Sequence, residues 1–379
     1  MKIVYWAMVA LICYAYVGYS LTILALAQFV RRPSRRSEIE PRVTYLITAY
    51  NEEKNIRAKL EQVLSLDYPY TKLEIIVASD GSTERTDDIV REFAGRGVRL
   101  VRVEGRVGKT ETQNRAVREA TGDVVIFSDA TTFYEKSAIR NLVRNYADPE
   151  VGAVSGRYEY RNASGGAIGL GSILFWKYEN LIKTLQTRIR TITGCCGCIY
   201  SVRRELYEPL PADIISDLVE PLKILEKGYR IVFEPEAIAF EETTEKTAEE
   251  FSMRVRVATR GMRGLWYMRS LFNPARYPFV SFQLFSHKVL RWLVPLFLLV
   301  LLAANLALLG SGRFYDATAV LQAAFYAAAL LGLCAERTQL NFKVLNVPLY
   351  FVTVNAAAVA AMYGLWRGYK AVTWETVRR

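Results

Sequence analysis

The segment LEIIVASD at residues 73–80, together with DVVIFSD at residues 123–129, decides the fold class of this 379-residue chain. Each is a short, mostly apolar run that ends in an aspartate, Asp80 in the first and Asp129 in the second. Short runs of Val, Ile and Phe are typical of strands buried on both faces of a parallel sheet. Because open α/β sheets bind ligands outside the carboxyl ends of their strands, we expect both aspartates to face one site.

Around these two segments, apolar runs alternate with helical patterns. The runs lie at residues 43–48, 73–79, 98–103, 124–128 and 151–155, and the helical patterns at residues 53–66, 86–94, 110–120 and 137–146. This alternation predicts an α/β domain with a wound, mostly parallel sheet. We expect the domain to cover residues 41–245.

Both ends of the chain are apolar enough to enter a bilayer. Residues 1–30 predict an N-terminal transmembrane helix, because the basic block at residues 31–36 follows the apolar stretch instead of preceding it as in a signal peptide. Arginines interleaved with aromatic residues predict amphipathic interface helices over residues 246–288. About three apolar segments fill residues 289–368, and a basic tail follows at residues 369–379. The α/β domain is therefore expected between membrane helices.

The charge distribution indicates how the chain sits in the membrane. The basic block after the first span predicts a cytoplasmic domain in a multi-pass protein of the cell (plasma) membrane. The formal net charge of +11 suits an anionic membrane surface, and no nucleic-acid module is recognisable, so nucleic acid is not an expected partner. Three trailing spans would leave the basic tail outside. We therefore expect one trailing segment, residues 317–335 being the candidate, to be re-entrant or interfacial.

Polar motifs at the predicted strand ends resemble those of the family 2 glycosyltransferases, in particular the membrane-embedded branch with the cellulose, hyaluronan and chitin-oligosaccharide synthases. The matching segments, in order, are TYLITAYNEE (44–53), SDGST (79–83), GK (108–109) and TGDVVIFSDAT (121–131). Residues 105–110 look like a phosphate-binding P-loop but do not match that motif, because Val103 stands where the motif needs glycine. The resemblance implies a GT-A-like fold.

The resemblance also implies a donor site. Its expected donor-binding residues are Tyr50, Asn51, Glu53, Asp80, Lys109 and Asp129, with Asp80 on the base and Arg106 and Arg256 at the diphosphate. Asp129 is the expected ligand of Mg²⁺ or Mn²⁺, which prefer oxygen ligands and bridge substrate phosphates. Thr131 replaces the second acid of the family's Asp-x-Asp motif, which leaves the metal dependence open.

Two later segments resemble the acceptor side of the family. Residues 194–205 match the segment beside the acceptor and imply roles for Gly194, Gly197 and Arg203. Asp217 matches the aspartate of a Glu-Asp motif and would be the general base, although Ser216 replaces the glutamate. Cys195, Cys196 and Cys198 lack zinc-ligand spacing and are expected to be buried thiols.

The implied function is inverting transfer from a nucleotide-sugar, first of all a UDP-sugar, to a glycan or lipid-linked acceptor for a cell-surface polysaccharide. Export or assembly subunits are further expected partners. Val257 stands where processive synthases have a tryptophan, so polymerisation and single transfer both stay open. Two other functions also stay open. One is a polyprenyl-phosphate sugar synthase, and the other is a non-catalytic membrane scaffold derived from the same fold.

Overall fold

An eight-stranded sheet lies at the centre of the described α/β domain. The computed structural model describes residues 1–161, 167–242, 247–338 and 343–373. The strand order is β3-β2-β1-β4-β7-β6-β8-β5. The strands are β1 (Val43–Ala49), β2 (Leu73–Asp80), β3 (Val98–Val103), β4 (Val124–Asp129), β5 (Phe133–Tyr134), β6 (Val151–Arg161), β7 (Tyr200–Arg203) and β8 (Arg230–Glu242). β1 to β4 are parallel, whereas β7 is antiparallel to both neighbours and β5 is antiparallel to β8. The prediction of a mostly parallel sheet is confirmed.

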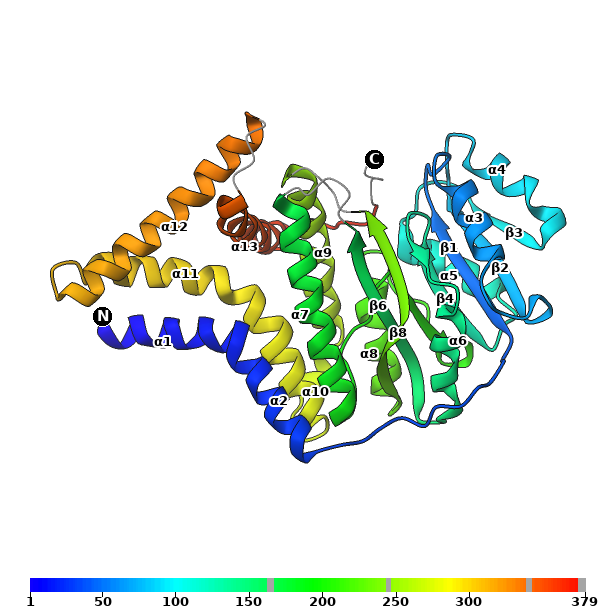
Figure 1. Cartoon of the computed structure of the whole chain (residues 1–379), viewed down its shortest axis with the longest axis horizontal. Helices are drawn as coiled ribbons and strands as arrows, with labels where there is room; N and C mark the ends of the chain where they lie inside the picture. Colours follow the sequence, from blue (N-terminus) through cyan, green and yellow to red (C-terminus); the bar gives the residue numbers. More distant parts are fainter. Residues whose placement is uncertain (162–166, 243–246, 339–342, 374–379) are drawn as a thin grey trace.

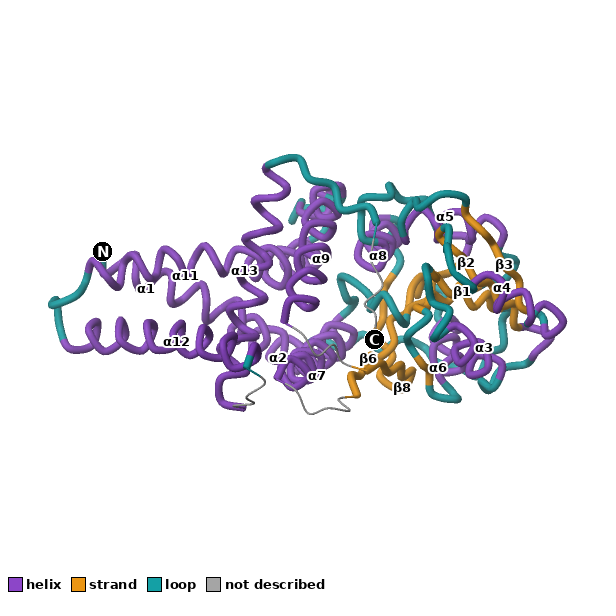
Figure 2. The backbone as a smooth tube through the Cα atoms, turned by 90° about the horizontal axis from the view of Figure 1, so that it is seen from above, coloured by secondary structure: helices purple, strands orange, loops and turns teal. Residues whose placement is uncertain are grey.

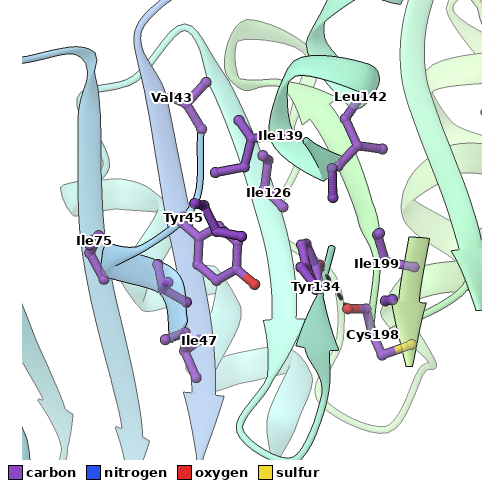
Figure 3. Packing of buried hydrophobic residues seen from close by; sticks show 14 of the residues in the cluster. Val43, Tyr45, Ile47, Ile75, Ile126, Tyr134, Ile139, Leu142, Cys198 and Ile199 are labelled. Carbon is purple, nitrogen blue, oxygen red and sulfur yellow. Dashed lines mark hydrogen bonds between the residues drawn. The ribbon is translucent and has the colours of Figure 1, made fainter. Parts of the chain in front are cut away.

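The central strands are buried on both faces, as their unbroken apolar runs predict. Successive residues of β1 enter opposite cores, with Tyr45 and Ile47 in one and Leu46 in the other. Figure 3 shows the first of these cores, where the Tyr134 hydroxyl donates a 2.8 Å hydrogen bond to the carbonyl of Cys198. The expected burial of the cysteine cluster is confirmed for Cys196 and Cys198, whereas Cys195 is partly exposed.

Helices lie at the positions that the alternation predicts, namely α3 (Ile56–Leu64), α4 (Thr86–Glu92), α5 (Lys109–Glu119) and α6 (Ala138–Val143). Two further helices, α7 (Ala167–Ile189) and α8 (Ser216–Glu226), lie outside the predicted alternation. The first helix begins three residues later than predicted, because Asn51 takes a left-handed backbone conformation (φ 51°) that turns the chain after β1. This turn keeps residues 50–55 available as a loop at the carboxyl edge of the sheet.

Within the described ranges, four helices are long and apolar enough to cross a membrane, which supports the expected membrane regions at both ends. The first candidate, Lys2–Phe29, consists of α1 (Lys2–Cys13), a π-helical turn and α2 (Tyr19–Phe29). The second, Pro278–Ala307, joins α10 (Pro278–Leu284) to α11 (Leu290–Ala307) and begins earlier than expected. The others are α12 (Arg313–Arg337) and α13 (Asn346–Trp366). Because α12 is an unbroken helix, it does not form the re-entrant turn that residues 317–335 were expected to contribute.

The amphipathic helix α9 (Thr247–Tyr267) directs several of its arginines into the protein. The guanidinium of Arg260 donates to the hydroxyl of Thr110 at 2.7 Å and to the carbonyl of Ile214 at 2.6 Å. Arg254 donates to Glu250 and Tyr350 at 2.8 Å. Arg254 and Arg260 therefore join α9 to α13, to α5 and to the segment before α8.

The membrane helices are not arranged as one parallel bundle. α1, α11 and α12 extend away from the sheet, whereas α13 runs across their direction beside α9 (Figures 1 and 2). After α13 the chain returns to the sheet, and the carbonyl of Val372 packs directly on Gly108, before α5. The described part of the basic tail therefore lies on the same side of the membrane helices as the α/β domain.

Candidate functional site

The carboxyl ends of β1, β2 and β4 meet at one edge of the sheet, as the strand pattern predicts. Ala49 pairs with Ser79, and Thr48 pairs with Asp129, so the residues that end these strands are neighbours in register. Tyr50 follows β1, whereas Asp80 and Asp129 end β2 and β4. The structure thus brings these three predicted residues to one edge.

Asp80 is fully buried and holds the loop that leads to α5. Its Oδ1 accepts a 2.8 Å hydrogen bond from the N–H of Val107, and its Oδ2 accepts a 3.0 Å bond from that of Gly108. The guanidinium of Arg106 stacks on the ring of Tyr50, 4.0 Å from its centroid. A carboxylate offers about four lone-pair sites, so Asp80 retains acceptor capacity for a further donor.

Asn51 and Glu53 connect the loop after β1 to the loop after β2. The side-chain carbonyl of Asn51 accepts a 2.9 Å hydrogen bond from the N–H of Thr83. The carboxylate of Glu53 accepts a 3.4 Å bond from the N–H of Arg85, while its own N–H donates to Glu84 at 2.6 Å. Both predicted residues therefore position the two loops relative to each other.

Glu52, not Glu53, is the acid of this loop that turns toward Asp129. Its side chain is buried, and Asn55 donates to its carboxylate at 2.7 Å. Burial raises the pKa of Glu52 to about 7, and the charges of Asp129 and Glu241 act in the same direction. The left-handed turn at Asn51 selects which of the two adjacent glutamates faces inward, and no sequence pattern reveals that choice.

Asp129 is paired with Lys109, the first residue of α5. The ammonium of Lys109 contacts Asp129 Oδ1, and both side chains stay partly exposed. Two residues further on, the Thr131 hydroxyl donates a 2.7 Å hydrogen bond to Glu241 Oε1. Tyr158 donates to the other oxygen of Glu241, also at 2.7 Å. A glutamate from β8 thus stands beside the threonine that replaces the second motif acid, and sequence reasoning missed it.

The residues around Asp129 suit a hard divalent cation. Asp129, Thr131 and Glu241 offer only oxygen donors, which Mg²⁺ and Mn²⁺ prefer. Within the described ranges, no group of three or more His, Cys, Asp or Glu side chains could hold a metal by itself. A cation here would therefore depend on substrate phosphate oxygens and water for its remaining ligands. With that provision, the donor set fits the expected metal.

Lys59, on α3, stabilises the turn around Asp129 from inside the domain, and no sequence motif predicts this role. Its fully buried ammonium donates to Ser128 Oγ at 2.9 Å and to the hydroxyl of Tyr45 at 3.0 Å, and it contacts the carbonyl of Thr132. Burial lowers the pKa of Lys59 to about 7. These bonds fix the turn that carries Asp129.

Asp217 lies in the first turn of α8. Its backbone carbonyl accepts a 2.9 Å hydrogen bond from Cys195, and the Ser216 hydroxyl donates to Gln113 at 2.7 Å. Burial raises the pKa of Asp217, the positive charges of Lys109, Lys183 and Arg260 oppose this rise, and the charge of Asp129 adds to it. Asp217 therefore shares an electrostatic environment with Lys109 and Asp129.

The glycine-rich segment before β7 lies against Asp217. A Cβ atom built on Gly197 would lie 2.6 Å from Asp217 Oδ2, so only glycine leaves room for the carboxylate. At Gly194 the corresponding atom would meet Leu218 at 3.2 Å. Both predicted glycines are thus beside the expected base.

The structure places Arg256 near Asp129 but places Arg203 far from it. Arg256 is half-buried, has no hydrogen bond or ion pair within the described residues, and interacts electrostatically with Asp129. Arg203 pairs with Val124 at the start of β4, so it lies at the opposite edge of the sheet from Asp129. Its guanidinium donates to the carbonyls of Val151, Tyr146 and Asp148 at 2.8 to 3.1 Å. The structure does not bring Arg203 to Asp129 and Asp217, because β7 is antiparallel to β4 and its last residue lies at the other edge of the sheet.

Comparison with known proteins agrees with this geometry. Residues 44–210 match the family model described as glycosyl transferase family 2. A probable glycosyltransferase, YdaM, of Bacillus subtilis (strain 168) is 32% identical over 242 residues, which are 60% of this chain and 56% of the relative. A poly-β-1,6-N-acetyl-D-glucosamine synthase of Staphylococcus aureus (strain COL) is 30% identical over 241 residues, 61% of this chain and 57% of the relative. The chain thus matches little more than half the length of these relatives.

The fold has a solved counterpart over nearly its whole length. The mannosyltransferase PcManGT from Pyrobaculum calidifontis, solved in complex with GDP-Man and Mn²⁺, superposes with a TM-score of 0.76 at 24% identity. The match covers 97% of this chain and 99% of that one, and it shows that this chain has the same GT-A-like fold. Together with the family model and the named relatives, this likeness confirms the resemblance of the sequence motifs. Residues 44–210 of this chain are therefore similar to the family 2 glycosyltransferases.

Proposed function

We propose that this protein moves a sugar, with inversion at the anomeric carbon, from a nucleoside diphosphate sugar to a glycan or lipid-linked acceptor at the membrane. One observation carries the proposal. Lys109, Asp129 and Asp217 come from three separate elements, yet Lys109 contacts Asp129 and the charges of both act on the carboxylate of Asp217. A cation for phosphate, a metal ligand and a candidate base are the groups that such a transfer needs.

The donor base would bind near Asp80 and Tyr50. The remaining acceptor capacity of Asp80 suits a ring N–H of the base, and the stacked Tyr50 and Arg106 border the same loop. A UDP-sugar is our first expectation for the donor. The Staphylococcus relative is named for an N-acetylglucosamine polymer, whereas the solved neighbour bound GDP-Man, so both nucleotide classes belong in the assay.

The leaving diphosphate would be stabilised by cations around Asp129. Lys109 and Arg256 already interact with Asp129. Arg106 lies three residues before Lys109, in the loop that leads to α5. Preorganised charges of this kind stabilise charge that develops in the transition state. A Mg²⁺ or Mn²⁺ ion held by Asp129, with Thr131 and Glu241 beside it, would neutralise further phosphate charge; the neighbour's Mn²⁺ supports this assignment.

Asp217 would act as the general base. Its oxygen would take the proton of the acceptor hydroxyl while the acceptor oxygen bonds to the anomeric carbon and the bond to the diphosphate breaks. Burial raises the pKa of Asp217, which makes the carboxylate a better proton acceptor than an exposed aspartate. Val257 offers no ring on which a sugar could stack, so a single transfer is favoured over polymerisation.

The membrane arrangement follows from a parity argument. The domain and the described tail are in contact, so the chain between them must cross a bilayer an even number of times. Of the three candidates α11, α12 and α13, only α13 runs across the direction of the others (Figures 1 and 2). We assign α13 to the membrane interface and α11 and α12 to a pair of crossings. With this assignment the basic tail and the domain would lie together, and the positive-inside rule favours the cytoplasmic side of the plasma membrane for both.

The test is an Asp217→Asn variant of the full chain in lipid nanodiscs. We expect unchanged donor binding and a loss of nucleoside diphosphate release of about 10²- to 10⁴-fold, measured over a panel of UDP- and GDP-sugars with Mg²⁺ or Mn²⁺. Asp88→Asn, at an exposed site on α4, is the control.

Two results would favour the other functions. Near-normal release by folded Asp217→Asn protein with a polyprenyl phosphate acceptor would favour a polyprenyl-phosphate sugar synthase, because an anionic acceptor needs no base. Absence of nucleotide binding in calorimetry, with or without Mn²⁺, would favour a scaffold.

A further inference from the structure

Two groups that the transfer needs, Lys109 and Asp217, stand in the first turns of two different helices, α5 and α8. A buried hydrogen bond joins the chain next to each of them. The hydroxyl of Thr110, the residue after Lys109, donates at 2.7 Å to the carbonyl of Ile214, which lies three residues before Asp217. This bond therefore helps to set the distance between the cation and the candidate base.

Two further side chains of α5 hold the same segment. Gln113 accepts a 2.7 Å hydrogen bond from the hydroxyl of Ser216. Asn114 donates to the carbonyl of Leu210 at 2.7 Å and accepts from its N–H at 3.0 Å. Both side chains are buried, as Thr110 is. We call these bonds between α5 and residues 210–216 the α5–α8 seam.

Arg260, on the interface helix α9, joins both sides of the seam. One Nη of its guanidinium donates to the hydroxyl of Thr110 at 2.7 Å, to the carbonyl of Ile214 at 2.6 Å and to that of Ala212 at 3.2 Å. The carbonyl of Ile214 thus accepts from both Thr110 and Arg260. A single side chain from a third helix therefore contacts the start of α5 and the segment that leads into α8.

Stability alone does not account for an arginine at this position. Only 5% of Arg260 is exposed, and its Nε has no hydrogen-bond partner within the described residues. Its bonds there go to a hydroxyl and to carbonyls and not to an acid, whereas Arg263, on the same helix, forms an ion pair with Asp213. Burial of a charge without a paired acid costs free energy. The observed bonds indicate what the charge does instead, which is to hold the seam.

The packing of α9 on α8 keeps Arg260 in this place. A Cβ atom built on Gly264 of α9 would lie 2.5 Å from Cγ2 of Val219 in α8, so the two helices approach closely there. A guanidinium is planar and presents its N–H groups in fixed directions. A small shift of α9 against α8 would therefore break the bonds that Arg260 makes.

We propose that Arg260 is a positioning residue for the sugar transfer, which holds Lys109 and Asp217 at the separation that the reaction needs. This inference rests on the proposed function and deepens it by adding a residue that acts through two others. Lys109 would meet the leaving diphosphate and Asp217 the acceptor hydroxyl, so their separation matters most in the transition state. Displacement of a reacting group by about 1 Å can cost about 10²-fold in rate.

The experiment compares variants of the full chain in lipid nanodiscs. Arg260→Met removes the guanidinium and keeps an unbranched side chain. Thr110→Val removes only the hydroxyl of the seam, in case Arg260→Met fails to fold, and Thr110→Ser retains that hydroxyl. Arg118→Met, at an exposed arginine in the last turn of α5, is the control. Nucleoside diphosphate release is measured with UDP- and GDP-sugars, and donor binding is measured by calorimetry.

We expect Arg260→Met and Thr110→Val to lower kcat about tenfold to a hundredfold and to change the donor Kd by less than about threefold. Thr110→Ser should recover most of the loss seen in Thr110→Val, and Arg118→Met should match wild type. Wild-type kcat in folded Arg260→Met, or an equal loss in Thr110→Ser and Thr110→Val, would overturn the proposal.

A double variant separates positioning from a general loss of structure. In an Asp217→Asn background, Arg260→Met should lower kcat by less than about threefold, because the base that it positions is already lost. Losses that multiply would overturn the positioning role. Wild-type kcat in Asp217→Asn alone would refute the proposed base, whereas an impaired Asp217→Asn beside a fully active Arg260→Met refutes only this inference.

Discussion

Substitution of Gly197 by alanine tests the position of the candidate base most directly. The new Cβ would lie 2.6 Å from Asp217 Oδ2 and 3.1 Å from its Cγ, whereas ordinary contact begins at 3.4 Å, so the carboxylate must move by about 0.8 Å. The backbone of Asp217 cannot retreat easily, because its carbonyl accepts from Cys195 and the adjacent Ser216 is bonded to Gln113. The side chain must therefore rotate away from its present direction.

A shift of this size has a predictable kinetic cost. Misplacement of a reacting group by about 1 Å can cost about 10²-fold, so we expect kcat to fall about tenfold to a hundredfold, or about 1.4 to 2.7 kcal/mol in the barrier. The KM for the donor should stay within about twofold, because Asp80 and Asp129 do not contact Gly197. The assay is steady-state release of nucleoside diphosphate with whichever donor the panel identifies.

Alanine substitutions at two other glycines should lower kcat less than Gly197→Ala does. Gly194→Ala should cause a smaller loss, because its Cβ meets only an apolar methyl group of Leu218 at 3.2 Å. Gly95→Ala should leave kcat unchanged, since nothing lies within 4 Å of its Cβ. A folded Gly197→Ala protein that turns over at the wild-type rate would refute the placement of Asp217 as the base.

Three other variants test separate parts of the site. In folded protein the pKa of Glu52 is about 7, above its usual 4.5, so its contribution to stability is present at low pH and is lost as the pH rises through 7. The thermal midpoint of wild type should therefore fall relative to that of Glu52→Gln between pH 5 and pH 8, and parallel curves would contradict this. Glu241→Gln removes the carboxylate beside Thr131 and should raise the Mn²⁺ concentration that supports half-maximal donor binding about tenfold, by calorimetry. An unchanged Mn²⁺ requirement would exclude Glu241 from the metal site. Arg203→Ala breaks three bonds to backbone carbonyls and should lower the free energy of unfolding by about 2 to 4 kcal/mol in denaturant titration, without changing the KM for the acceptor. A changed acceptor KM at unchanged stability would restore its acceptor-side role.

Sequence patterns predicted correctly those elements whose formation depends on consecutive residues. A strand buried on both faces needs an unbroken apolar run, so β1, β2 and β4 lie within one residue of their predicted ends. The edge at which Asp80 and Asp129 meet then follows from parallel pairing alone. Apolar segments of sufficient length likewise predicted where the candidate membrane helices lie.

Other features depend on contacts that no local pattern encodes. Glu241 reaches Thr131 only because β8 lies beside β5, and Lys59 reaches Ser128 only because α3 packs on the sheet beneath that turn. The position of Arg203 far from Asp129 likewise depends on the antiparallel pairing of β7, because an alternating pattern does not reveal in which direction a strand runs.

By itself, the sequence determined the fold class, the similarity to the family 2 glycosyltransferases and the sheet edge where Asp80 and Asp129 lie, because consecutive residues set both the burial of a strand and the side chains at its end. Only the tertiary structure decided which groups complete the site. It turned Glu52 instead of Glu53 toward Asp129 and brought Glu241 to Thr131. The physical reason is that charges act through space, and the distances between them are set by how distant segments pack.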